Sequence, residues 1–513
     1  MPDLVLLLSQ GIQSVDVEVD AWALVTFIAY LLIIIGIGIY SARFSSKGLA
    51  HYFIGGREIN RLVVALSSVV SGRSAWLLLG FTGMAYVQGA SAVWAALGYT
   101  IVEFLLLFFY APRIRSFTEA YDCITLPDFF SARFNDTKGY LRVILVIIIF
   151  IFLGSYISAQ FVAGGKAFAS SFGVAQNNGI IITAAIVVLY TVLGGFLAVS
   201  LTDVIQAFFM VIALLVLPVM AMVQFGGWGA VSAELASLKS GLVDPFAIGF
   251  GAMIGFLGIG LGSTGNPHII SRYMSIDDPK QLRFSAYLGT IWNVLMAAGA
   301  VLVGLVGRAY FPEQDMLIAS DPENIYPMLA EQQLPSVIFG LIAASIFAAI
   351  MSTCDSQLLV VSSAVVRDIY DKLINKNRVT SQKTLVVYSR IVVVALVILA
   401  LLMAFFFQEL VFWLVLFAWA GVGAAIGPIS ILALFWRQTT WAGAMAGMLT
   451  GTAVTLIWYN VPALKESLYE LIPAFIGSIL VTIVVSWFTR PPENTGDMFS
   501  SMQGAKVNHR GSE

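Results

Sequence analysis

The sequence predicts an all-α polytopic membrane protein with about thirteen transmembrane helices, because a spanning helix needs about 20 mostly apolar residues. Of the 513 residues, 59% are hydrophobic and only 11% are charged, whereas about a quarter of an ordinary soluble protein is charged. The polar stretches between the apolar ones are too short to form a soluble domain. We therefore expect residues 1–513 to form a single transmembrane domain in a lipid bilayer.

The long apolar stretches define the predicted spans in chain order. They are 21–43, 61–86, 91–112, 141–168, 176–196, 201–224, 247–271, 284–311, 336–366, 386–407, 410–436, 440–461 and 468–489. No positively charged segment precedes the first stretch, so we expect no cleaved signal peptide.

The Lys and Arg residues predict the orientation, because cytoplasmic loops carry an excess of them. Most of the 27 basic residues fall in every second connection, from the one after the first span to the tail at 490–513. We expect a multi-pass protein of the cell (inner) membrane, with its N-terminus outside and its C-terminal tail in the cytoplasm.

Two spans are dense in Gly and Ser, at 67–74 and 255–268, and the second also contains a Pro. Unwound backbone at membrane depth is found where it lines a cavity or is buried in protein. The two spans are five apart and run in opposite directions, as in an inverted repeat whose halves each open with a discontinuous helix. Alternatively, the small residues only permit close helix packing.

The inverted repeat divides the chain into a core and flanking segments. The first repeat is 61–225, the second is 247–407, the flanking helices are 21–43 and 410–489, and the tail is 490–513. Substrate and ion sites in such transporters lie near the bilayer midplane, between the broken helices.

Polar side chains gather within the apolar span 336–366, where Ser352, Thr353, Asp355 and Ser356 follow one another closely. A carboxylate at membrane depth is costly and usually functional. Hydroxyls and a carboxylate suit an alkali or alkaline-earth cation better than zinc or copper. Hydroxyls bonding back to the preceding turn would explain Ser352 and Thr353, but not Asp355.

Arg73 lies in the middle of a span, too far from its end to reach water easily. The candidate anions are Asp355, Asp203 or the carboxylate of a solute, which Arg can hold with two hydrogen bonds. Asp203 also fits as the cap of a helix N-terminus. Glu103, in the span 91–112, has no obvious partner in the sequence.

Composition also excludes several classes of protein. With three His and two Cys residues, the chain offers neither a disulfide framework nor most transition-metal sites. No nucleophile–base pair is evident, so we do not expect an enzyme. We expect no nucleic-acid partner and no obligate protein partner.

Five sequence motifs resemble those of the sodium/solute symporter family, most closely its sodium/proline branch, over roughly 20–495. They are Ile124–Phe134, Gly194–Gln206, Gly265–His268, Ala348–Thr353 with Gln357–Leu359, and Phe435–Arg437 with Gly443–Gly447. The resemblance implies a leucine-transporter-type inverted five-helix core that couples inward sodium flow to solute uptake by alternating access.

The resemblance also implies two sodium (Na+) sites. The ligands of the first would be the carbonyls of Val70, Arg73 and Ala349 and the hydroxyls of Ser352 and Thr353. The ligands of the second would be Ser352, Asp355, Ser356 and Asp203, so that Ser352 is shared by the two sites.

The expected substrate-binding residues come from the two broken spans and from the span 141–168. They are Ser74, Trp76, Tyr156, Gln160, Ile259, Ser263, Asn266 and Pro267. Tyr156 and Gln160 also fit as hydrogen-bond partners between helices. The sodium/proline branch has an acidic residue and Met where this chain has Gly72 and Arg73, and aromatic residues at the positions of Ile259 and Ser263.

The leading hypothesis is a sodium-coupled symporter that imports proline, another amino acid or a monocarboxylate. One alternative is a sodium-independent or proton-coupled carrier in which Arg73 replaces the cation. Another is a membrane sensor of solute, although no kinase domain follows residue 490.

Overall fold

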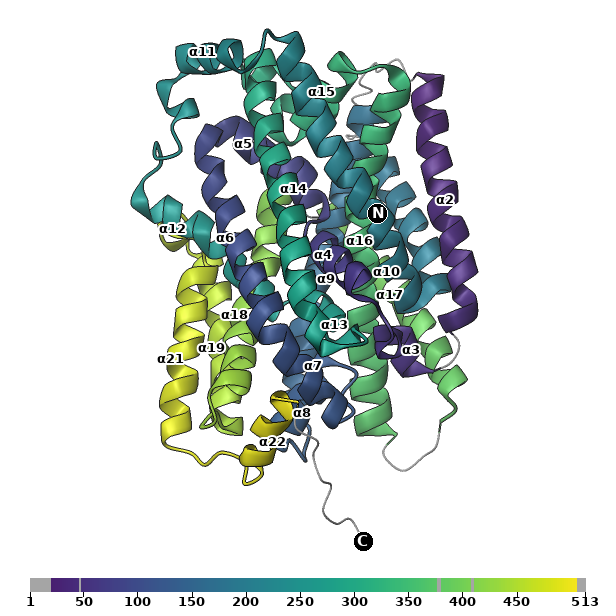
Figure 1. Cartoon of the computed structure of the whole chain (residues 1–513), viewed down its shortest axis with the longest axis vertical. Coiled ribbons are helices and arrows are strands. Elements are labelled where there is room, and N and C mark those ends of the chain that lie inside the picture. The colour runs from purple at the N-terminus through teal and green to yellow at the C-terminus, as the bar shows by residue number, and fades with distance from the viewer. Residues whose placement is uncertain (1–19, 46–47, 376–379, 407–409, 505–513) are drawn as a thin grey trace, which may run out of the picture.

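The computed structural model describes residues 20–45, 48–375, 380–406 and 410–504. These residues form a bundle of long helices (Figure 1). The main helices are α2 (Ala21–Ser45), α4 (Arg61–Ser71), α5 (Thr82–Gln88), α6 (Val93–Leu105), α7 (Ala111–Ala120), α9 (Tyr140–Phe172), α10 (Gln176–Gln224), α12 (Phe250–Gly258), α13 (Pro267–Ser275), α14 (Leu282–Tyr310), α16 (Ser336–Ser363), α17 (Gln382–Phe406), α18 (Val411–Phe435), α19 (Trp441–Asn460) and α21 (Leu471–Trp487).

Within the described residues, nine helices are long and apolar enough to cross a membrane. Four shorter apolar helices accompany them. These are Arg61–Ser71, Gln176–Val192, Phe250–Gly265 and Leu471–Trp487, and each lies within a predicted span. The all-helical, multi-spanning class is thus confirmed. Within α10, a kink at Gly195 separates the predicted spans 176–196 and 201–224.

The first predicted break lies between α4 and the π-helical turn Trp76–Phe81. The side chain of Asn60 starts α4 by accepting hydrogen bonds from two backbone N–H groups of the first turn. α4 stops at Ser71, where Gly72 follows, and Gly disfavours a helix interior. The interruption at Gly72 and Arg73 falls inside the predicted stretch 67–74.

The second predicted break follows α12 and runs as a 3₁₀ segment, Ile259–Gly265, to α13. Pro267 disfavours helical backbone at the residue before it, and Asn266 is extended, with φ −78° and ψ 108°. Close packing is also present, because a Cβ on Gly262 would lie 1.9 Å from Trp419 Nε1 of α18. Interrupted helix and close packing are therefore both present at this break, while the inverted repeat stays a prediction.

A third irregularity bends α10 at Gly195, where φ is 62° and ψ is −172°. A positive φ favours glycine, which lacks a Cβ. Asp203 lies past this bend inside a continuous helix. The interpretation of Asp203 as an N-terminal cap is therefore wrong.

The helices are arranged around α16, most of whose apolar length is buried. Figure 1 shows α2 at one edge of the bundle and α19 and α21 at the opposite edge. The short helices α3 (Leu49–Ile54), α8 (Leu126–Phe134) and α22 (Thr495–Met502) lie toward one end, and α11 (Trp228–Leu238) and α15 (Ile325–Gln333) lie at the other. This separation agrees with the predicted alternation of connections, while the side of the membrane that each end faces stays a prediction.

Candidate functional site

The first break meets α16 through two neighbouring hydroxyl groups. Ser352 Oγ lies 3.4 Å from the carbonyl oxygen of Val70 and 3.0 Å from that of Ala349. Thr353 Oγ1 donates to the carbonyl of Ser71 at 3.1 Å. The structure therefore brings together hydroxyl and carbonyl oxygens of the kind that bind hard cations.

The main chain of Arg73 belongs to the start of the next helix. Its N–H donates to the carbonyl of Val70 at 2.9 Å, and its own carbonyl accepts from the N–H of Leu77 at 3.3 Å. The predicted ligand oxygen of Arg73 thus takes part in a helical hydrogen bond.

The side chain of Arg73 forms a buried ion pair with Glu103 of α6, with Nη2 and Oε2 2.6 Å apart. Nε donates to Asn293 Oδ1 at 3.0 Å, and the guanidinium lies 3.8 Å from the ring centre of Tyr99. Glu103 also accepts from Asn293 Nδ2 at 2.8 Å and from Ser263 Oγ at 3.0 Å. Glu103, which lacked a partner in the sequence, is the anion that Arg73 needs.

Asp203 lies in a second buried cluster, between α4, α10, α13 and α16. Its Oδ2 accepts from Ser67 Oγ at 2.5 Å and from Ser71 Oγ at 3.3 Å. Nη2 of Arg272 lies 3.3 Å from the same oxygen and also donates to Ser356 Oγ. The predicted pairing of Asp203 with Arg73 is wrong, because Arg272 is its partner.

Asp355 lies next to this cluster on α16. Its Oδ1 accepts from the N–H of Ser356 at 2.5 Å and from Ser356 Oγ at 3.0 Å. Its Oδ2 and Asp203 Oδ1 are buried and accept no hydrogen bond from the described residues. Asp355 is not the counter-charge of Arg73 either, since that guanidinium points to Glu103.

Arg272 is the functional candidate that the sequence did not reveal. Its position just after the span 247–271 placed it among the cytoplasmic basic residues. In the structure it is 1% exposed, since every residue of α13 is buried in the protein. One sequence signal could have indicated its burial: Arg272 follows His268 by one helical turn. In the structure the carbonyl of His268 accepts a hydrogen bond from Arg272 Nη1 at 2.6 Å.

A small cavity lies beside the two breaks and is enclosed mainly by aromatic and aliphatic side chains. Its lining residues are Gly72, Arg73, Trp76, Tyr99, Tyr156, Ile259, Val415, Leu416 and Trp419. Its volume is about 10 Å³, close to the smallest that holds one water molecule. The side chains are therefore closed around the cavity.

Three predicted substrate residues, Trp76, Tyr156 and Ile259, line this cavity. Ser74 lies behind them and accepts from the hydroxyl of Tyr156 at 3.1 Å. Gln160 Oε1 accepts from the N–H of Ala75 at 3.0 Å and so holds the start of the helix after the first break.

The other three predicted substrate residues lie elsewhere. Ser263 donates to Glu103, and Asn266 Nδ2 donates to the carbonyl of Gly262 at 2.8 Å. Pro267 lines a separate cavity with Leu126 and Leu359. These residues shape the second break without reaching the cavity between the helices.

Several lining residues were not predicted: Tyr99, Val415, Leu416 and Trp419. Tyr99 precedes Glu103 by one helical turn, and residues spaced in this way share a helix face. That spacing could have linked Tyr99 to a buried charge. The residues of α18 carry no comparable signal, because an apolar face of a spanning helix also fits lipid.

The beginning of α18 closes the cavity and is held by a buried acid. Glu323 accepts from the N–H groups of Val411 and Phe412 at 3.0 and 2.8 Å. Glu323 Oε2 also lies 2.6 Å from Lys166 Nζ of α9. Phe412 stacks on Trp76, with ring centres 5.7 Å apart. Lys166 and Glu323 thus fix the helix end that covers Trp76.

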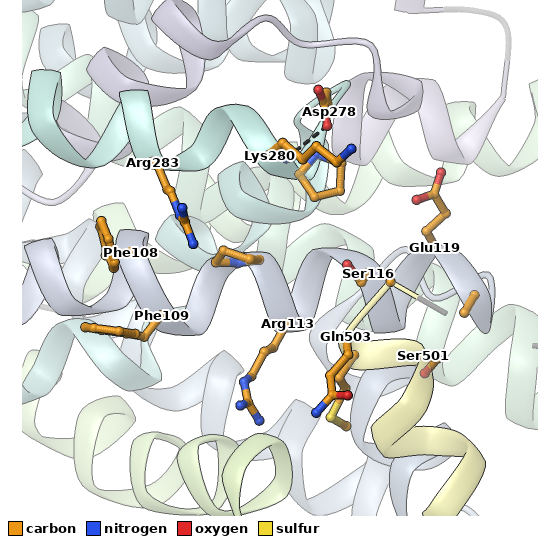
Figure 2. A pocket seen from close by; sticks show the side chains of 15 residues that line it. Phe108, Phe109, Arg113, Ser116, Glu119, Asp278, Lys280, Arg283, Ser501 and Gln503 are labelled. Carbon is orange, nitrogen blue, oxygen red and sulfur yellow. Dashed lines mark hydrogen bonds between the residues drawn. The ribbon is translucent and has the colours of Figure 1, made fainter. Parts of the chain in front are cut away.

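A larger cavity, about 1170 Å³, lies apart from the two polar clusters. Figure 2 shows its lining, with Arg113 of α7, Arg283 of α14 and Gln503 after α22. None of the residues in the two clusters lines it. Its size therefore does not identify it as the site of the transport chemistry.

Comparisons with known proteins agree on one family. The profile of the Sodium:solute symporter family matches residues 52–451. The sodium/proline symporters of Staphylococcus aureus strains JH9 and COL are each 39% identical over 486 residues, which cover 93% of this chain and 94% of theirs.

Solved structures of transporters share the fold. A sodium-coupled sialic acid symporter in a substrate-bound outward-open state matches with a TM-score of 0.76 and 19% identity, covering 92% of this chain and 99% of its own. A nucleobase-cation-symport-1 family transporter, closed with bromovinylhydantoin bound, matches with a TM-score of 0.52 and 15% identity, covering 88% and 98%.

Proposed function

Because this chain belongs to the sodium:solute symporter family, we propose that the small solute it imports together with sodium is proline. The chain is a transporter and not an enzyme. Proline is favoured over other amino acids and monocarboxylates by the extent of the match to the sodium/proline symporters, which covers nearly the whole chain. Sodium is cargo in this reaction and not a resident cofactor.

Sodium binding is supported by one observation, the contact of α16 with the first break. A sodium ion there would be held by the hydroxyls of Ser352 and Thr353 and the carbonyls of Val70 and Ala349. Rotation of a hydroxyl hydrogen away from its present acceptor turns the lone pairs of the hydroxyl oxygen toward the ion and frees the carbonyl oxygen that had accepted the hydrogen. The carbonyl of Arg73 contributes only if its bond to Leu77 opens.

The solute half of the proposal rests on the closed cavity. Trp76, Tyr156 and Trp419 surround it with rings that suit a compact, partly apolar molecule. The Arg73 guanidinium is already neutralised by Glu103, so the cavity favours a solute without net charge, such as the proline zwitterion, over a monocarboxylate. Opening of the start of α18 would admit the solute.

Alternating access follows from the proposed topology. We propose thirteen crossings, with repeats at 61–225 and 247–407 and an outside N-terminus in the cell membrane. The two breaks, in α4–α5 and α12–α13, support this proposal, since such helices flank the central site of inverted-repeat transporters.

The alternative with Arg73 as an internal cation is not favoured. Its guanidinium lies against Glu103, Asn293 and Tyr99, while Ser352 and Thr353 bond to carbonyls of the first break. Reconstitution in proteoliposomes tests the proposed function. Labelled proline should accumulate under an inward sodium gradient and not under an equal potassium gradient. Equal uptake in both would refute sodium coupling, and sodium-driven uptake of a different solute would refute proline.

A further inference from the structure

Three basic side chains line the larger cavity from two sides (Figure 2). Arg113 belongs to α7, while Lys280 lies just before α14 and Arg283 lies in its first turn. Among the residues that the structure describes, none of the three takes part in an ion pair. By contrast, the buried Arg73 and Arg272 each meet a carboxylate. The three cations of the cavity are therefore available to an anion from outside the protein.

The cavity also has two acidic side chains, and neither forms an ion pair with the three cations. Glu119 pairs with Arg115 of its own helix, with Oε2 and Nη1 2.8 Å apart. Asp278 Oδ1 accepts from the backbone N–H of Lys280 at 2.9 Å and so caps the turn before α14. When Arg115 is counted with the lining residues, four basic residues stand against two acidic ones and leave a net charge of +2.

Aromatic rings continue the cavity along the helices that carry the charges. The guanidinium of Arg283 lies 5.4 Å from the ring centre of Phe108. Phe109 also lines the cavity and is 53% exposed. Tyr287, one turn after Arg283, lies 6.3 Å from Phe108 and is 58% exposed. Both segments belong to stretches long and apolar enough to cross a membrane, so a ligand here meets positive charge beside a surface that suits lipid chains.

We propose that the larger cavity binds the headgroup of an anionic phospholipid. Its phosphate would lie among Arg113, Lys280 and Arg283, and its acyl chains would follow Phe109 and Tyr287. Basic pockets between spanning helices on the cytoplasmic side are typical sites for such headgroups. The volume of about 1170 Å³ exceeds that of an ordinary small-molecule pocket, about 300–1,000 Å³, and leaves room for a headgroup. This site is independent of the solute and the ion of the proposed function.

The competing explanation is that the three cations are solvated and attract anionic lipid only through the charge of this end of the protein. Every exposed Lys or Arg at that end would then contribute about equally. A comparison of basic residues inside and outside the cavity therefore separates a lipid site from a general surface charge.

The experiment measures thermal unfolding of the purified full-length protein in detergent, with native mass spectrometry to count the lipids that it retains. The added probes are phosphatidylglycerol, phosphatidylcholine or inorganic phosphate. Phosphatidylglycerol should raise the unfolding temperature more than phosphatidylcholine, because a ligand that binds the folded state stabilises it. Inorganic phosphate should have little effect, because it has no acyl chains to bind the aromatic surface.

The test variant is Lys280→Gln with Arg283→Gln, and both of these side chains are exposed, so the variant should fold. Its affinity for phosphatidylglycerol should fall about 30-fold, since two basic contacts to the headgroup are lost. The matched control, Lys138→Gln with Arg490→Gln, removes the same charge from exposed residues that follow α8 and α21 and do not line the cavity. It should keep the full effect of phosphatidylglycerol.

If the test variant does not fold, Arg283→Gln alone keeps the proposal testable, with an expected loss of affinity of about fivefold. Equal stabilisation by phosphatidylglycerol and phosphatidylcholine would overturn the proposal, as would an unchanged affinity in the folded variant. Equal losses in the test variant and the matched control would assign the binding to general surface charge. A full shift with inorganic phosphate alone would make the cavity a phosphate site and not a lipid site.

Discussion

The two interrupted helices both present backbone carbonyls to neighbouring side chains, but different donors satisfy them. At the first break, the carbonyls of Val70 and Ser71 accept from the hydroxyls of Ser352 and Thr353. At the second break, the carbonyl of Ile259 accepts from Trp419 Nε1 at 2.8 Å. There the carbonyl of Gly262 accepts from an asparagine N–H.

This difference decides which break can hold a cation. A hydroxyl keeps oxygen lone pairs that can turn to an ion, whereas an indole or amide N–H offers only its hydrogen. The second break has two hydroxyls on its carbonyls among the described residues, that of Ser430 of α18 on Thr264 and that of Thr264, from the break itself, on Leu261. We therefore keep the first break, where two hydroxyls of α16 meet the carbonyls of Val70 and Ser71, as the proposed ion site. The second break packs closely against α18.

The largest expected effect concerns the ion pair that anchors the first break. Glu103→Gln leaves the Arg73 guanidinium buried without a counter-charge, which should cost about 3–5 kcal/mol of stability. Thermal and denaturant unfolding of the purified protein measure it. The double variant Arg73→Met with Glu103→Gln removes both charges and should recover most of the loss, because removing a whole buried ion pair costs far less than leaving one of its charges unpaired.

Two outcomes would contradict this assignment. Glu103→Gln could be as stable as the unmodified protein, which would mean that water or another acid balances Arg73. The double variant could be as unstable as the single one, which would place the loss in the contacts of Glu103 with Ser263 and Asn293.

Both breaks and the hydroxyl cluster could be predicted because their signals are local. The density of Gly and Pro marks weak helix at 255–268, and polar side chains within an apolar span mark Ser352 and Thr353. Each signal depends on residues within one or two helical turns of one another, and such residues can be read directly from the sequence. The membrane class follows from composition in the same way.

The partners of the buried charges could not be predicted, because packing between distant segments selects them. Glu103 meets Arg73 only when α6 lies beside the first break. Arg272 lies near the end of a predicted span, where a basic residue normally marks the cytoplasmic interface. The burial of every residue of α13 depends on tertiary packing, which no periodicity in the sequence shows.

The second-largest effect tests packing at the second break. Gly262→Ala places a Cβ 1.9 Å from Trp419 Nε1, and such overpacking should cost about 1–3 kcal/mol. The unfolding midpoint of the purified protein measures it. Gly154→Ala is the matched control on α9, since a Cβ there meets nothing within 4 Å, and it should be neutral or stabilising by about 0.5–1 kcal/mol. Equal losses in both variants would refute the packing role of Gly262.

A smaller effect compares two serines in parallel positions. Ser352 bonds to Val70 and Ala349, and Ser430 bonds to Thr264 and Gly427. Ser352→Ala removes a proposed sodium ligand and should raise the sodium concentration for half-maximal uptake about tenfold, or ~1.4 kcal/mol. Ser430→Ala should leave that concentration unchanged. A similar rise of that concentration in both variants would contradict the assignment of the sodium site to the first break.

The smallest expected effect concerns the indole N–H of the second break. Trp419→Phe keeps an aromatic ring beside the cavity but removes the donor to the carbonyl of Ile259, which should cost about 1 kcal/mol of stability. Sodium dependence should stay unchanged, while proline affinity should fall because the smaller ring encloses the cavity less closely. Trp413→Phe, on the exposed side of α18, is the control and should alter neither. A change in sodium dependence with Trp419→Phe would show that the second break also contributes to the ion site, because the indole N–H cannot itself bind a cation.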